Sequence, residues 1–182
     1  FRRGGVRRWD ASVSGDREGA VYATITDITA TPVVDGARVY SGNQSGRTVA
    51  LDANTGARIW SAPHGAYGEV WPEGEAVFLV NDQGELVRLT ASDGTEVWRV
   101  PMPYFENSRE RRRKAVFAHY GPVVAGARVR VVSSDGLLRS FDPESGALVS
   151  TVGIPGGATA PPAVAGGTLY VVSKRGQLHA FR

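Results

Sequence analysis

Short apolar stretches alternate with glycine-containing polar turns along most of this chain. Segments such as Ala76–Val80 and Thr168–Val172 are rich in β-branched and aromatic residues, and each precedes a turn and a second apolar segment. Such residues favour strands, and glycine permits the tight turns between them. No stretch shows a sustained helical period with capping residues. The pattern therefore predicts an all-β chain of short antiparallel strands.

The turns recur with a fixed period. In two independent sets of glycines, the steps are 38, 52 and 40 residues; the sets are Gly36, Gly74, Gly126 and Gly166, then Gly46, Gly84, Gly136 and Gly176. About four strands in a unit of about 40 residues is typical of the blades of a β-propeller. The longer step indicates an insertion at residues 104–119.

The repeat defines the expected domain organisation. Residues 1–182 form a single propeller fragment, with blades at about 31–62, 69–100, 121–154 and 161–182. Residues 5–13 align with the end of a unit and are expected to form an outer strand, whereas the last unit provides three strands. We expect about four blades, which is half of an eight-bladed ring. The fragment then either closes on itself or pairs with a second copy, so that no sheet edge is exposed.

A short motif marks the third turn of each unit. It is clearest at Asp52, Gly56 and Trp60, returns at Gly94 and Trp98, and has a fainter copy ending at Trp9. An aspartate can accept hydrogen bonds from backbone N–H groups two residues on, and a tryptophan on an outer strand can fill the wedge between blades. We interpret these residues as structural.

Composition narrows the function classes. The chain has no cysteine, so it contains neither a disulfide nor a thiolate metal site. No apolar run is long enough to span a membrane. The formal net charge of +3 is uneven, because nine of the 21 basic residues lie in two segments: Arg2, Arg3, Arg7 and Arg8, then Arg109, Arg111, Arg112, Arg113 and Lys114. Without a recognised binding module, these clusters do not indicate nucleic-acid binding; a solvated loop or a contact with an acidic partner explains them.

Signatures of catalysis are not found. His64, His119 and His179 lie in different units, and the aspartates next to turn glycines are explained by turn chemistry. The chain has no zinc-protease, nucleophile-elbow or P-loop motif. We expect no catalytic residue, no metal site and no bound cofactor.

The Asp-x-x-Thr-Gly-x-x-x-Trp segment at 52–60 resembles the tryptophan-docking motif of the PQQ-type repeat family. This family includes quinoprotein alcohol dehydrogenases, which use pyrroloquinoline quinone and Ca²⁺, and BamB-type outer-membrane assembly lipoproteins, which use neither. Two further segments, 29–52 and 161–182, look like BamB-type blades, and the insertion looks like that of the α-proteobacterial branch. The dehydrogenases carry a disulfide between adjacent cysteines, which this chain lacks. The resemblance is thus to the C-terminal half of the BamB-type propeller.

This resemblance implies a non-catalytic scaffold at the periplasmic face of the outer membrane. Such proteins bind a POTRA domain of BamA within the β-barrel assembly complex and aid insertion of outer-membrane β-barrel proteins. Their membrane attachment is a lipid anchor, which would lie outside this chain. In the family an Asp-x-Asp pair contributes to the BamA contact; here Asp27 matches the first acid and Thr29 replaces the second. Two alternatives remain: a fragment of a quinoprotein dehydrogenase, and a propeller sensor domain of a signalling protein.

Overall fold

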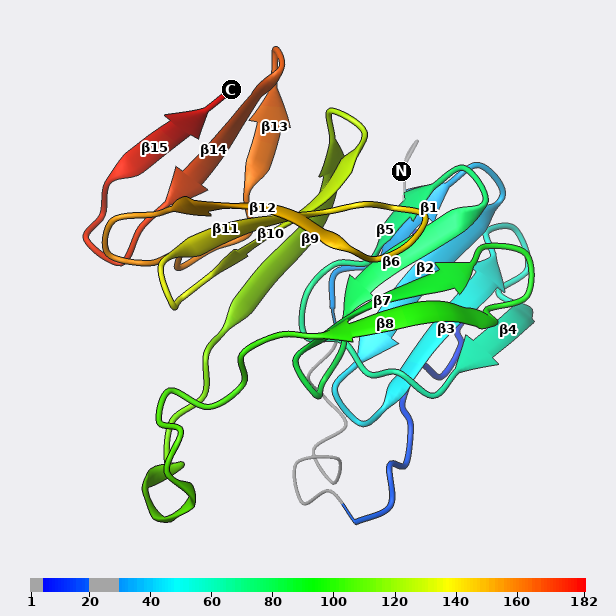
Figure 1. Ribbon diagram of the computed structural model, residues 1–182. Coiled ribbons are helices and arrows are strands. Elements are labelled where there is room, and N and C mark those ends of the chain that lie inside the picture. Colours follow the sequence, from blue (N-terminus) through cyan, green and yellow to red (C-terminus); the bar gives the residue numbers. More distant parts are fainter. Residues whose placement is uncertain (1–4, 20–29) are drawn as a thin grey trace.

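The computed structural model describes residues 5–19 and 30–182, and these residues form four antiparallel sheets in sequence order (Figure 1). The first sheet contains β1 (Val33–Asp35), β2 (Arg38–Asn43), β3 (Arg47–Asp52) and β4 (Arg58–Ala62). The second contains β5 (Trp71–Glu73), β6 (Ala76–Val80), β7 (Glu85–Thr90) and β8 (Glu96–Pro101). The third contains β9 (His119–Ala125), β10 (Arg128–Ser133), β11 (Leu137–Phe141) and β12 (Leu148–Gly153). The fourth contains β13 (Ala163–Ala165), β14 (Thr168–Val172) and β15 (Leu178–Phe181).

Burial explains the sequence pattern within a blade. The second and third strands lie in the middle of each four-stranded sheet, and every residue of β6 is buried. A strand covered on both faces reads as a continuous apolar run, as Ala76–Val80 does. The fourth strands form the outer edge, and all six residues of β12 are exposed. The alternation of strongly and weakly apolar strands along the chain therefore reports each strand's position in its blade.

The hydrophobic core is divided into three layers, one between each pair of consecutive sheets. Tyr40 and Trp60 of the first sheet pack with Leu79 and Leu89 of the second. The other two layers have the same construction: one contains Phe78, Leu86, Val129 and Phe141, and the next contains Val132, Leu138, Leu169 and Val171. Sheets packed face to face in series are the architecture of a β-propeller. The predicted all-β propeller of four-stranded antiparallel blades is confirmed, with three strands in the fourth sheet.

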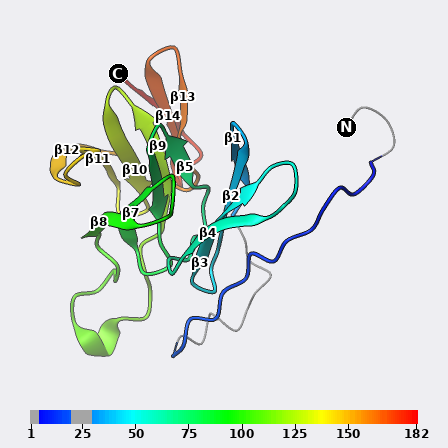
Figure 2. The same ribbon diagram turned by 90° about the vertical axis from the view of Figure 1, so that its right-hand side faces the viewer.

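The sheets follow one another as a fan, in which the first strands lie innermost and contact one another in turn (Figures 1 and 2). The chain runs back and forth across each blade, so its turns fall on two faces. One face, which we call the motif face, carries the turns between third and fourth strands. The other, which we call the arm face, carries the turns between second and third strands and the connections between blades.

Residues 5–13 differ from the prediction. They were expected to form an outer strand, but the structure gives this segment no strand pairing. Within the described residues this segment contacts the first sheet through side chains, as in the hydrogen bonds of Trp9 to Ala53 O and of Arg58 to Ser12 O, and its backbone pairs with no strand. Trp9 nevertheless makes the blade contact that its alignment with Trp60 implies, as described below.

The predicted insertion is a hairpin-like arm (residues 104–118) between β8 and β9. Tyr104 accepts a hydrogen bond from Phe117 N at 2.8 Å, Glu106 N donates to Ala115 O at 3.0 Å, and Phe105 pairs with Val116. Its tip contains a single turn of 3-10 helix, Glu110–Arg112, with no buried residue. The arm projects from the arm face, away from the sheets, in both ribbon views (Figures 1 and 2).

Candidate partner-binding surface

The tryptophans of the repeat motif lie at the junctions between blades. Trp60 donates its indole N–H to Ala91 O at 2.9 Å, and a Cβ atom on Gly94 would come within 2.6 Å of its ring. In the same way, Trp98 donates to Pro143 O and packs on Gly146 in the third blade. Trp9 donates to Ala53 O and packs on Gly56 in the first blade. In each case the indole lies on the glycine of the next unit and bonds to the carbonyl three residues before it. These residues build the propeller.

The aspartates of the motif stabilise their own turns. Asp52 accepts hydrogen bonds from Asn54 N at 2.9 Å, Thr55 N at 2.8 Å and Thr55 Oγ1 at 2.9 Å. Asp142 has the same arrangement with Glu144 and Ser145. The hydrogen bonds from Thr55 and from Ser145 lower the pKa of the respective carboxyl, because they stabilise the charged form. Their carboxylates are therefore occupied as turn acceptors.

An ion pair joins the segment before the first blade to the second blade. Arg17 donates to Asp82 Oδ1 and to Pro63 O, both at 2.9 Å, and Asp82 also accepts from Gly65 N at 2.9 Å. The Asp82 side chain is fully buried, whereas that of Arg17 is 21% exposed. A buried carboxylate needs this compensation, since an unpaired charge inside a protein is strongly unfavourable. The contact fixes the connection between the first two blades on the arm face.

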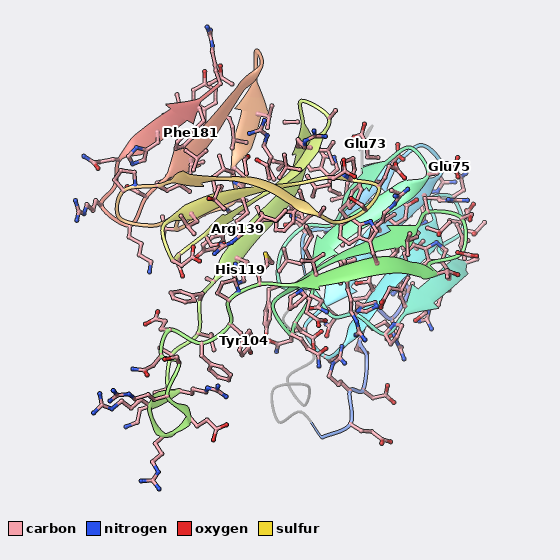
Figure 3. All side chains as sticks on the ribbon, in the orientation of Figure 1. Glu73, Glu75, Tyr104, His119, Arg139 and Phe181 are labelled. Carbon is pink, nitrogen blue, oxygen red and sulfur yellow. The ribbon has the colours of Figure 1, made fainter. Side chains whose placement is uncertain are left out.

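A pocket of about 440 Å³ lies on the arm face, where the arm joins the blades. Its walls come from the connection before β5, the turn after β6 and the start of β9, and they are mainly apolar and aromatic: Tyr67, Val80, Tyr104, Val116, Phe117 and Tyr120. Figure 3 shows Tyr104 and His119 at the root of the arm. Tyr104 is seated on Gly84, where a Cβ atom would come within 2.6 Å of its ring. We call this feature the aromatic pocket.

The wall at His119 is held by hydrogen bonds on both ring nitrogens. Nε2 lies 2.9 Å from Pro103 O, which can only accept, so Nε2 carries the proton. Nδ1 lies 2.7 Å from Ser133 Oγ, which also accepts from Arg139 at 3.0 Å, and Arg139 pairs with Asp135. Burial lowers the pKa of His119 despite the opposing hydrogen bond to Pro103. The imidazole is therefore neutral at pH 7 and rigidly oriented.

Several large apolar side chains near the pocket remain exposed to solvent. Tyr67 is 52% exposed, Val116 48% and Phe105 40%. Partial burial still raises the pKa of Tyr67, so its hydroxyl keeps its proton at neutral pH. Phe105 makes an edge-to-face contact with Tyr104, with ring centroids 5.0 Å apart, and the Arg113 guanidinium lies 4.9 Å above the Phe105 ring. The root of the arm thus presents a continuous aromatic surface to solvent.

The sequence-predicted partner residues cannot be placed on this surface. Asp27 and Thr29 lie outside the described residues, directly before the segment that begins at Ala30. The basic run of the insertion is evident in the sequence, whereas the aromatic pocket beside it was not predicted. The spacing of Tyr104, Phe117 and Tyr120 around that run was the available signal; Tyr67 could not be added without the fold.

Other kinds of site were sought across residues 5–19 and 30–182. In those residues no three His, Cys, Asp or Glu side chains come together as a metal-binding group. None of their helices has the length and hydropathy needed to cross a membrane.

Similar solved structures share the fold. BamB from Moraxella catarrhalis has a TM-score of 0.67 at 24% identity; the match covers 84% of this chain and 49% of that one. The computationally designed protein Ika4 has a TM-score of 0.64 at 20% identity, covering 90% and 93% of the two chains. Quinohemoprotein alcohol dehydrogenase from Comamonas testosteroni also has a TM-score of 0.64, at 19% identity, covering 80% and 29%. The chain thus spans about half the length of the Moraxella protein. No curated protein matches it in sequence.

The match to a sequence family is more specific than the similarity in fold. The family described as outer membrane protein assembly factor BamB matches residues 1–100 and 134–182. The two matched segments contain every copy of the tryptophan motif and exclude the arm. Since they make up most of the sequence, the chain belongs to this family of PQQ-type repeat β-propellers.

Proposed function

We propose that this chain is part of the propeller of a non-catalytic scaffold in the outer-membrane β-barrel assembly machinery. The scaffold binds BamA through a POTRA domain and aids insertion of β-barrel proteins. The observation that carries the proposal is the family match over residues 1–100 and 134–182. The scaffold lies at the periplasmic face of the outer membrane and is held there by a lipid anchor outside this chain.

The architecture suits a binding role. Rigid blades packed through three apolar layers hold their connecting loops in fixed positions, so a partner meets a preformed surface. The charged motif residues Asp52 and Asp142 are already engaged in turns. Affinity in such a scaffold comes from surface complementarity, without a chemical step.

The contact with BamA is tested by charge reversal at the residue that the family resemblance singles out. Full-length protein carrying Asp27→Arg should bind a purified POTRA segment at least about tenfold more weakly, as expected for reversal of a contact charge. Glu75→Arg is the matched control, because Glu75 is exposed in the turn between β5 and β6 on the motif face. Binding is measured by calorimetry. Equal affinity of the Asp27→Arg variant and the control, with the fold intact, rejects the assignment of Asp27.

The dehydrogenase alternative makes a different prediction. Quinohemoprotein dehydrogenases share the propeller fold at 16–19% identity, which establishes fold similarity alone. A quinoprotein should acquire a quinone absorption band and dye-linked alcohol oxidation after incubation of the full-length protein with pyrroloquinoline quinone and Ca²⁺. The scaffold proposal expects neither change, and a stoichiometric chromophore with activity would overturn it.

A further inference from the structure

The aromatic pocket is an addition to the shared repeat. The family match omits residues 101–133, which include the arm and the whole of β9 and β10. Tyr104, Phe117 and Tyr120 all lie in this omitted segment, whereas Tyr67 and Val80 lie in the matched part. The insertion therefore converts an ordinary connection between two blades into the wall of a cavity.

The cavity has the size and lining of a binding pocket. Its volume of about 440 Å³ lies in the range of ligand sites, and its walls combine apolar rings with a few polar groups. Exposed apolar side chains are ordinary when they are scattered, but Tyr67 and Val116 line one cavity, and the exposed Phe105 packs against Tyr104 in its wall. The space is too small for a folded element and suits one or two large side chains.

The pocket is also preformed. Tyr104 is seated on Gly84, and the His119 ring is held at both nitrogens by Pro103 and Ser133. A partner entering such a site does not have to order these walls, so less conformational entropy is lost on binding.

The arm adds an excess of positive charge beside the pocket. Residues 104–118 contain five basic and two acidic residues, so their net charge of +3 equals that of the whole chain. Arg113 pairs weakly with Glu110 at 3.9 Å, whereas Arg109, Arg111, Arg112 and Lys114 form no ion pair within the described residues. All five basic side chains belong to exposed residues. This field attracts acidic groups to the mouth of the pocket.

The distribution of residues along the arm favours a polypeptide over a lipid surface. Residues 107–114 at the tip contain no apolar side chain that could enter a bilayer. The aromatic rings lie instead at the root of the arm, where Tyr104, Phe117 and Tyr120 line the pocket. A flat membrane could meet the tip but could not fill the pocket.

We propose that the aromatic pocket binds one large apolar side chain, preferentially aromatic, from an extended segment of a partner protein, while the arm pairs with acidic residues flanking that side chain. This contact is separate from the one assigned to Asp27 and Thr29. It does not depend on BamA being a partner.

The probe is a fluorescein-labelled short peptide with one tryptophan between two pairs of glutamates. Two control peptides replace the tryptophan with alanine or the glutamates with lysines. Binding to the full chain is followed by fluorescence anisotropy at low and high salt. We expect the tryptophan–glutamate peptide to bind, each control peptide to bind at least about tenfold more weakly, and salt to reduce the affinity.

Variants locate the site. Tyr67→Ala should weaken binding by about tenfold or more, because it removes a half-exposed pocket wall. Its matched control is Leu178→Ala, an exposed apolar residue in β15. The double variant Arg111→Glu/Arg112→Glu should have a similar effect, whereas Lys174→Glu/Arg175→Glu, in an exposed turn of the last blade on the same face, should not. Both controls should remain within about twofold of the wild type.

Four results would overturn the proposal. Equal binding of the alanine peptide, or unchanged affinity in Tyr67→Ala, would mean that the pocket accepts no side chain. Arm-dependent binding to phosphatidylglycerol vesicles without peptide binding would identify the arm as a membrane contact. Self-association of the chain that is lost in Tyr67→Ala, again without peptide binding, would assign the pocket to a second copy.

Discussion

Trp60 of the first blade lies directly on Gly94 of the second, where a Cβ atom would come within 2.6 Å of the indole. Gly94 has a φ of +76°, a conformation that L side chains rarely adopt. The same indole donates to Ala91 O, so both its face and its edge are used. The glycine of the motif is therefore required for a close contact between blades as well as for the turn.

Gly94→Ala should destabilise the protein by about 2–4 kcal/mol, because strain at positive φ adds to a clash with a buried ring. Gly74→Ala is the matched control: Gly74 has a φ of +57°, but no atom lies within 4 Å of its added Cβ. The control should lose only about 1 kcal/mol, from the backbone conformation alone. Urea unfolding measures both, and equal losses would show that the contact with Trp60 is unimportant.

Arg17→Met should destabilise the protein by about 3 kcal/mol, because it removes the Arg17 charge that pairs with the buried Asp82 carboxylate. The substitution keeps the aliphatic length and removes the charge. Arg7→Met is the comparison, since the Arg7–Asp10 pair is about 80% exposed on both sides and separated by 3.7 Å. Limited proteolysis should cut residues 5–19 faster only in the Arg17 variant; equal cutting of both would contradict the anchoring role.

Acidification should reduce stability before any carboxylate of the turns is protonated. Burial lowers the pKa of His64 below 6.5, although the ion pair with Glu96 at 2.9 Å opposes this, and burial also lowers the pKa of His119. The unfolded chain then binds more protons than the folded one, so stability is present above pH 6.5 and is lost as pH falls through the lowered values. The loss from the turn aspartates comes later, below their ordinary value of 3.8.

The test is urea unfolding between pH 7.5 and 4.5. His64→Gln and His119→Gln should each flatten the loss of stability below pH 6.5 relative to the wild type. A wild-type slope that survives both substitutions would assign the acid sensitivity to other groups.

The arm should be dispensable for folding. Replacing residues 107–114 by Asn-Gly, which favours a tight hairpin turn, should change the free energy of unfolding by less than about 1 kcal/mol. The reason is that the removed tip contains no buried residue, while the pairings of Phe105 with Val116 and of Glu106 with Ala115 are kept. A large loss of stability, measured by urea unfolding, would show that the tip supports the blades.

The blades could be predicted from sequence because their determinants are local. Turn glycines, β-branched runs and the Asp–Gly–Trp motif act within a few residues, and their agreement at steps of 38, 52 and 40 residues fixed the repeat. The predicted outer strand at 5–13 was wrong. The copy of the motif there was identified correctly, but a strand also needs a neighbouring strand with which its backbone can pair. Trp9 keeps the docking contact without strand pairing.

The candidate surface was less accessible to sequence reasoning. Arg17 and Asp82 are 65 residues apart, and nothing local pairs them. The aromatic pocket combines Tyr67 and Tyr104, from two different connections between blades, with Tyr120 of β9. The walls of the pocket meet only after the blades stack. The basic run therefore predicted a charged loop but not the cavity beside it.

The junction contact between an indole and the next unit's glycine has a direction. The tryptophan of each motif packs on the glycine of the following unit, and the glycine of each motif receives the tryptophan of the preceding unit. The contacts therefore form a head-to-tail series. In the first blade Trp60 pairs with Ala50, and in the third blade the equivalent pair is Ser150 with Ser140. The third blade therefore has a serine in place of the motif tryptophan. The seam between the third and fourth blades is therefore held by the apolar layer around Leu138 and Leu169, with no motif tryptophan from the third blade. Since nearest-neighbour seams open independently in repeat proteins, the fourth blade should detach first when the array begins to unfold.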